Sequence, residues 1–213
     1  MQLKRHTLAA ALLATLMSPA VLAQDWTAKF GVTRYDTSSK TSGIKGIGIP
    51  PGADAQTGDA TTLIAVIERK LTPNIGIELV LGLPPKIKAR ATGSVAFLGG
   101  DVLSASNVAP TLIVNYYFGD ESQTLRPYVG AGINYTTFRS IKSSLAPKVE
   151  MSDSTGLVVQ AGLNYAINKQ MGLFASVARV DVKSDVVATA STVLTTTIDF
   201  RPITYSAGVT FKF

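Results

Sequence analysis

The residue types that most enzymes use for covalent or metal chemistry are almost absent from this chain. It has no cysteine and a single histidine, His6, in a segment that we expect to be cleaved off. Without these residue types a protein cannot form a Ser–His pair, a Cys–His pair or a His–zinc site. We therefore expect no enzymatic activity, and no catalytic residue, cofactor site or metal site.

The groups that remain for chemistry are charged and amide side chains, set singly into short apolar segments. Glu68 and Lys70 stand two residues apart, and Lys29 and Glu78 lie in similar segments. Residues two apart share one face of a strand, and a charge on a buried face needs a partner. We expect at least one of these carboxylates to contact Lys29 or Lys70. Such pairs either plug a lumen or simply tie neighbouring strands together.

The N-terminal residues have the features of a secretory signal peptide. Basic residues precede an apolar run from Leu8 to Met17, and Val21 and Ala23 occupy the −3 and −1 positions of a cleavage site. The run is too short to span a bilayer as a helix. We expect residues 1–23 to be removed, and residues 24–213 to form one domain; a retained N-terminal anchor is the alternative.

The rest of the chain predicts an all-β protein, a single eight-stranded antiparallel transmembrane β-barrel. The sequence is 46% hydrophobic and only 16% charged, which favours a membrane barrel over a soluble secreted domain. Short turns alternate with long connections, the pattern of barrels with periplasmic turns and extracellular loops. The eight alternating segments are residues 26–34, 61–71, 74–84, 109–119, 126–138, 154–167, 171–184 and 196–213.

The two faces of these segments differ in a way that favours lipid on the outside. In the sixth segment Leu157, Val159 and Leu163 share one face, whereas Gly156 and Gln160 lie on the other. A soluble barrel would be apolar inside and polar outside. Aromatic residues are expected at the two membrane interfaces: Trp26, Tyr116, Phe118, Phe211 and Phe213 on the periplasmic side, and Tyr35, Tyr135 and Phe138 on the outer side.

Five stretches, in order, resemble the OmpW family of small outer-membrane barrels. They are TPNIGIELVLGLPPK (72–86), APTLIVNYYF (109–118), RPYVGAGINYTTF (126–138), GLNYAINKQMGLFASVARVDV (162–182) and RPITYSAGVTFKF (201–213). The resemblance implies a narrow, partly hydrophobic channel that passes small apolar compounds, including alkanes in some members. Typical members carry a bulky inward aromatic residue where this chain has Ala178. This lumen is then either wider at that level or closed by another residue.

Strand direction and side-chain parity divide the expected lumen into two halves. The outer half is expected to be apolar and to provide a binding lane for a hydrophobic molecule, or merely packing. It comprises Ile64, Val66, Val80, Ala178, Val180 and Val182. The half near the periplasm is expected to be polar. It comprises Lys29, Glu68, Lys70, Glu78, Asn115, Gln160 and Asn164.

Two further groups of residues suggest contacts outside the lumen. Basic residues at the outer ends of the third and fifth strands can meet lipopolysaccharide phosphates, or can simply be solvated: Lys86, Lys88, Arg90, Arg139 and Lys142. At the C-terminus, apolar residues alternate up to Phe211 and Phe213. This ending resembles the signal read by the outer-membrane assembly machinery.

We therefore expect a barrel in the outer membrane of a Gram-negative bacterium, acting as a passive channel for small hydrophobic compounds. The alternative is a closed structural barrel whose loops serve as a receptor for phage, toxin or host. The expected partners are outer-membrane lipid, lipopolysaccharide, the assembly machinery and small hydrophobic solutes. No nucleic acid is expected, and the protein is expected to be a monomer.

Overall fold

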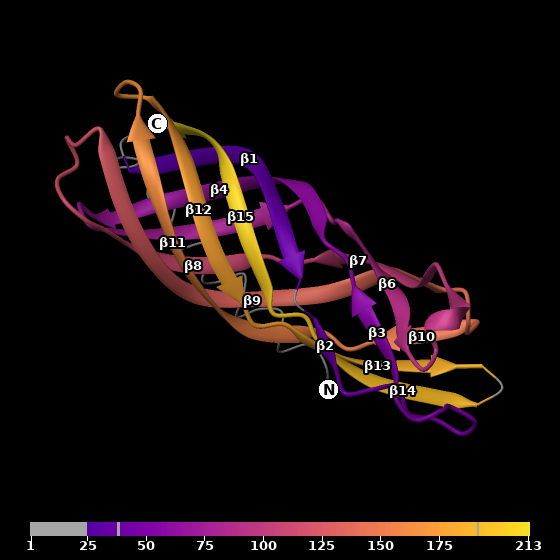
Figure 1. The fold of residues 1–213 in the computed structure, drawn as a ribbon. Helices are drawn as coiled ribbons and strands as arrows, with labels where there is room; N and C mark the ends of the chain where they lie inside the picture. Colours follow the sequence, from indigo (N-terminus) through magenta and orange to yellow (C-terminus); the bar gives the residue numbers. More distant parts are fainter. Residues whose placement is uncertain (1–24, 38, 191) are drawn as a thin grey trace, which may run out of the picture.

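The computed structural model describes residues 25–37, 39–190 and 192–213, so the expected signal peptide lies outside the described residues. Eight long strands of the described chain form a closed antiparallel barrel (Figure 1), as the sequence predicts, because the last of them pairs back onto the first. No helix among these residues is long and apolar enough to cross a membrane. The barrel strands are β1 (Trp26–Thr37), β4 (Ala60–Thr72), β5 (Ile75–Gly82), β8 (Thr111–Tyr117), β9 (Leu125–Ser143), β11 (Ser154–Ala166), β12 (Met171–Val180) and β15 (Pro202–Lys212).

The predicted ranges of the seventh and eighth strands are longer than the barrel strands in the structure. The seventh ends as β12 at Val180, and the eighth is divided into β14 (Val193–Asp199) and β15. Arg201, at the division, has a φ of 37°, a conformation uncommon for residues other than glycine. Its guanidinium Nη2 lies 2.7 Å from the carboxylate of Asp199. The chain bends here, which a regular polarity alternation does not signal.

The long outer connections, predicted as loops, are largely folded into strands. Three of these strands, β7, β6 and β3, extend the barrel sheet from the outer part of β9. Four others form a separate sheet in the order β10-β13-β14-β2. Together they extend the barrel at the end opposite the C-terminus (Figure 1). These elements are β2 (Lys40–Thr41), β3 (Ala53–Thr57), β6 (Lys86–Gly93), the 3-10 helix η1 (Ala96–Leu98), β7 (Asp101–Val108), β10 (Lys148–Met151), β13 (Lys183–Thr189) and β14.

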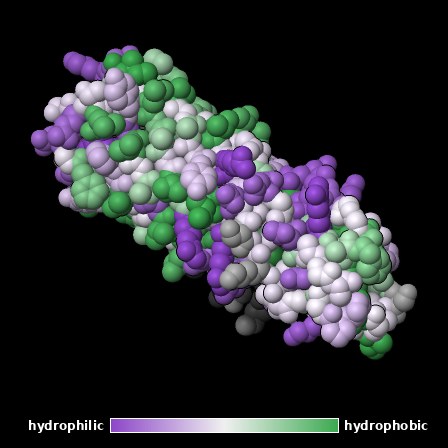
Figure 2. Space-filling view, in the orientation of Figure 1, coloured by the Kyte–Doolittle hydropathy of each residue, from purple (hydrophilic) through white to green (hydrophobic). Residues whose placement is uncertain are grey.

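The outer face of the barrel is apolar, as the parity of the strands predicts. Leu63, Leu157 and Ile133 are more than half exposed, and hydrophobic side chains gather over the barrel in Figure 2. Hydrophilic ones gather at the turn end and where barrel and extension meet. Large apolar groups directed outward suit lipid. The aromatic prediction was wrong for Tyr35 and Phe138, which line the interior instead.

Candidate functional site

The outer half of the barrel encloses a cavity with about 1050 Å³ of space between atoms, part of it open to solvent. Its aliphatic lining comes from strands far apart in sequence, including β4, β5 and β12. Ile64 and Val66 are almost fully buried. The structure places all of the predicted outer-lumen residues on this cavity: Ile64, Val66, Val80, Ala178, Val180 and Val182.

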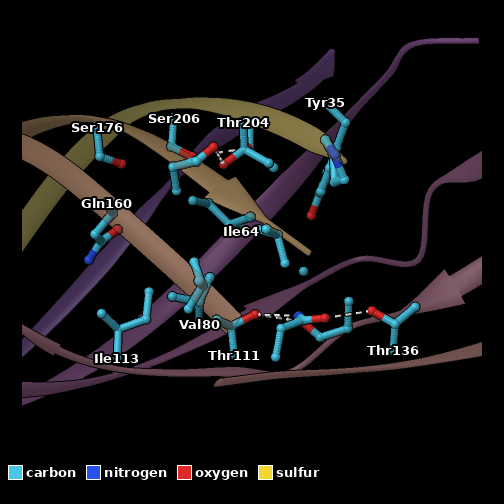
Figure 3. Close-up of a pocket in the computed structure, with 18 of the residues that line it drawn as sticks. Tyr35, Ile64, Val80, Thr111, Ile113, Thr136, Gln160, Ser176, Thr204 and Ser206 are labelled. Carbon is cyan, nitrogen blue, oxygen red and sulfur yellow. Dashed lines mark hydrogen bonds between the residues drawn. The ribbon is translucent and has the colours of Figure 1, made fainter. Parts of the chain in front are cut away.

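A set of hydroxyl and amide groups, which sequence analysis did not identify, also lines the cavity wall (Figure 3). The Ser206 hydroxyl donates to the Thr33 hydroxyl at 2.9 Å. Asn134 donates to the Thr111 hydroxyl and accepts from the Thr136 hydroxyl, both at 2.7 Å. Because these groups bond to one another, a solute without hydrogen-bonding groups leaves those bonds intact. Even-numbered residues of β9 face inward, which would have identified Asn134 and Thr136.

The floor of the cavity is a buried ion cluster centred on Lys29 of β1. Its ammonium Nζ lies 2.8 Å from Glu68 on β4 and 2.8 Å from Glu78 on β5. All three side chains are at most 5% exposed. The carboxylate–ammonium contacts that were expected from sequence are thus made here by Lys29 rather than by Lys70.

Amide side chains extend the ion cluster across the barrel. Asn115 of β8 donates to Glu78 at 2.9 Å, and Gln160 of β11 donates to Asn115 at 2.7 Å. Opposite Asn115 stands Gly130, where a Cβ would lie 2.1 Å from the amide oxygen of Asn115. A glycine is therefore required for the network to fit. We call Lys29, Glu68, Glu78, Asn115 and Gln160 the polar floor.

A second hollow of about 550 Å³ lies on the periplasmic side of this floor. Lys70 and Asn164, the other two predicted lower-lumen residues, line it. Lys70 forms an ion pair with Glu121, in the turn between β8 and β9. The hydrogen bond from Lys70 lowers the pKa of the Glu121 carboxyl from its ordinary value. The predicted polar residues therefore divide between two sites, one buried and one at the periplasmic mouth.

The barrel wall is interrupted beside the cavity, between β5 and β8. The backbone ladder of this pair ends at Val80 and Thr111, and pairing resumes only between Lys86 and Ser106. Pro84, Pro85 and Pro110 lie in this interval, and proline has no N–H to donate. The cavity reaches this seam, because its lining includes Gly82 and Ala109 from the two sides.

The predicted basic residues come together on the extension rather than at a loop base. On paired strands Lys86, Ser106 and Arg139 form one rung, and Lys88, Ser104 and Lys142 form another, two residues further along β6. Lys88 and Arg90 both bind Asp101, at 2.6 and 3.2 Å. Their hydrogen bonds lower the pKa of the Asp101 carboxyl from its ordinary value. All five basic residues are exposed, so this group, which we call the basic patch, can meet a polyanion.

Comparison with known proteins identifies the family. A sequence model of the OmpW family matches residues 23–213. The chain belongs to the OmpW family. It is 34% identical over 188 residues to outer membrane protein W of Escherichia coli K12, covering 84% of this chain and 85% of that one.

Solved structures show the same fold. The crystal structure of OprG from Pseudomonas aeruginosa matches with a TM-score of 0.84 at 24% identity, covering 90% of this chain and 96% of that one. The solid-state NMR structure of AlkL, an outer membrane protein of Ectopseudomonas oleovorans, gives 0.71 at 25% identity, covering 92% and 93%. The protein is accordingly an outer-membrane β-barrel in contact with lipid.

The aromatic residues near the outer end of the cavity are not the ones that the sequence predicted to point inward. Ala178, where the family resemblance led us to look for an aromatic residue, presents only a methyl group to the cavity. Phe138 of β9 and Phe200, between β14 and β15, line it instead. Phe138 shares the inward parity of Asn134 and Thr136, a signal that could have identified it. Phe200 lies at the bend in the chain, where parity carries no information.

Proposed function

We propose that this OmpW-family protein is a passive channel that takes small apolar compounds from the cell exterior into its outer lumen. One observation carries the proposal: the cavity is lined mainly by buried aliphatic and aromatic side chains, whereas a water-filled porin has a polar interior. Five of its polar side chains bond to one another: Ser206 with Thr33, and Asn134 with both Thr111 and Thr136. An apolar solute therefore displaces water without breaking hydrogen bonds of the wall.

The polar floor favours release to the side over release downward. An apolar solute moving toward the periplasm would have to separate Lys29 from Glu68 and Glu78, and unpaired buried charges are costly. The interrupted seam between β5 and β8 requires no such step. Leu81 and Leu83 beside the seam are exposed on the lipid face. We propose that the solute leaves through this seam into the bilayer.

The basic patch supports a proposal for the protein's surroundings. Lys86, Lys88, Arg139 and Lys142 lie in two nearby rungs where β6 and β7 pair along the outer part of β9, and basic side chains bind phosphate through charge-assisted hydrogen bonds. We propose that they contact lipopolysaccharide phosphates. These contacts would hold the surrounding sugar layer against the mouth of the channel.

The channel proposal is tested by uptake of a hydrophobic probe into cells that carry wild type, Val180→Asp or no barrel, at matched surface levels. Val180 is buried and faces the cavity. We expect clear uptake through wild type and slower uptake through Val180→Asp, because the carboxylate places a charge in the apolar lane. Val180→Leu is the matched control and should retain most of the uptake.

Two outcomes would contradict this proposal in different ways. Equal uptake by wild type and Val180→Asp, both above cells without the barrel, would mean that the solute passes elsewhere. Equal uptake by all cells would favour a closed structural barrel that acts through its extracellular part.

A further inference from the structure

A pair of stacked phenylalanine rings lies at the outer boundary of the lumen cavity. The ring centroids of Phe138 and Phe200 are 5.5 Å apart, and their planes are inclined by 25°. Both side chains are buried, at 8% and 4% exposure. They come from opposite parts of the chain, Phe138 from β9 and Phe200 from the link that leads into β15.

A further hollow, distinct from the one on the periplasmic side, lies beyond these rings inside the extracellular extension. It has about 240 Å³ of space, and the rings line it as well as the main cavity. The residues common to both hollows are Ile87, Phe138 and Phe200. The aromatic pair and Ile87 therefore form the partition between them. The remaining lining of the outer hollow is almost entirely apolar: Thr57, Ala89, Leu103, Ala105, Met151 and Ile198.

The backbone on both sides of the partition is held in place. Phe138 lies in the ladder between β7 and β9, paired with Asn107. The Phe200 N–H donates to the Val182 carbonyl at 2.9 Å, and the next residue, Arg201, is fixed by Asp199. Opening the partition therefore calls for rotation of side chains between rotamers, not for rearrangement of strands.

We propose that Phe138 and Phe200 form the narrowest point between the cell exterior and the lumen cavity, and set the size of solute admitted. This inference rests on the proposed channel function. Slender or flat apolar solutes can pass along rings that turn aside, whereas branched or cage-shaped solutes need both rings displaced together. Here the two phenylalanines supply the closure that Ala178, with its single methyl group, does not.

The size of the opening can be tested without relying on transport, because the chain contains no cysteine. Ser176→Cys would place a single thiol in the cavity, whose lining includes Ser176 (Figure 3). Intact cells would be treated with two charged thiol reagents that cannot enter through lipid, a small methanethiosulfonate and a bulky sulfonated maleimide. Because separating stacked rings costs about a factor of two to ten in an opening equilibrium, Phe138→Ala with Phe200→Ala should raise labelling by the bulky reagent by about that factor.

The control is Phe30→Ala in the same cysteine background. Phe30 of β1 is 51% exposed on the lipid face and does not line the cavity. It should leave labelling by the bulky reagent unchanged. If the double alanine variant does not reach the surface in folded form, Phe138→Leu with Phe200→Leu serves the same purpose. Folding is checked by heat-modifiable migration on gels.

Uptake of a linear alkane and of a cage hydrocarbon such as adamantane supplies the second measurement. The double variant should shift the uptake ratio toward the cage compound by about the same factor of two to ten. Rapid bulky labelling of the parent protein, or no change in the variants, would overturn the partition. Faster labelling without wild-type uptake above barrel-free cells would leave the partition standing, and would overturn the channel function instead.

Discussion

Replacing Lys29 by methionine is expected to destabilise the barrel strongly, because it removes the positive charge at the centre of the polar floor. The carboxylates of Glu68 and Glu78 each lie 2.8 Å from its ammonium and are at most 5% exposed. Removing one partner of a buried ion pair costs about 3–5 kcal/mol. That corresponds to a loss of about two to four powers of ten in the folding equilibrium constant.

Lys70→Met is the matched control. It makes the same substitution on the same interior face, but Lys70 pairs with Glu121, whose side chain is 48% exposed. Exposed pairs contribute only about 0–1 kcal/mol. The difference between these two variants isolates the effect of burial from the loss of a lysine as such.

The measurement is urea unfolding of the purified barrel in lipid vesicles, followed by tryptophan fluorescence and gel migration. Adding Glu68→Gln and Glu78→Gln to Lys29→Met should recover most of the loss, because a neutral buried amide costs far less than an unpaired carboxylate. If Lys29→Met is as stable as Lys70→Met, or if the glutamine changes rescue nothing, the polar floor is not the buried charge cluster described above.

Three further predictions concern the lumen, assembly and the extension. Ala178→Trp should fill part of the cavity and reduce hydrophobic-probe uptake without lowering barrel levels; uptake equal to wild type would place the solute path elsewhere. Deleting Phe213 should sharply lower insertion in cells, while the purified chain still folds in detergent; normal amounts of heat-modifiable barrel would contradict this. The carboxyl of Asp101 should titrate below its ordinary pKa in NMR spectra, since Lys88 and Arg90 bind it. Its stabilising effect is present above the unfolded-state pKa and is lost as the pH falls through the lower folded-state value; Lys88→Met with Arg90→Met should return the titration toward the ordinary value.

The barrel could be predicted from sequence because lipid imposes a strict rule on it. Outward residues such as Leu157 must be large and apolar, inward ones such as Gly156 are free to be small or polar, and this contrast repeats every two residues. The same parity placed six of the aliphatic residues that line the cavity. This alternation of apolar and polar residues depends on contact with lipid, so it is weaker where the chain leaves the membrane.

The extracellular strands escaped prediction for that reason. In β6 and β7 both faces carry small or polar residues, as in KARATG (88–93) and SASN (104–107), so no alternation separates strand from loop. Phe200 escaped because it lies at the bend marked by Arg201. Its position depends on the hydrogen bond from its N–H to the Val182 carbonyl, which is a contact across the fold rather than a pattern along the chain.

The free energy of an apolar solute limits what this lumen can do. Burying a methylene gains about 0.8 kcal/mol relative to water, but the bilayer core offers nearly the same gain, so the cavity cannot concentrate solute above its level in lipid. Under the proposed channel function its effect must therefore be on rate, by carrying the solute past the polar sugar layer that bare lipid does not bypass. A cavity of this kind works best when it binds weakly, opens to lipid and stays closed to water and ions. In this proposal the interrupted seam between β5 and β8 provides the opening to lipid, and the polar floor around Lys29 keeps the lumen closed to water and ions. Removing the floor should therefore admit ions without speeding the passage of apolar solutes.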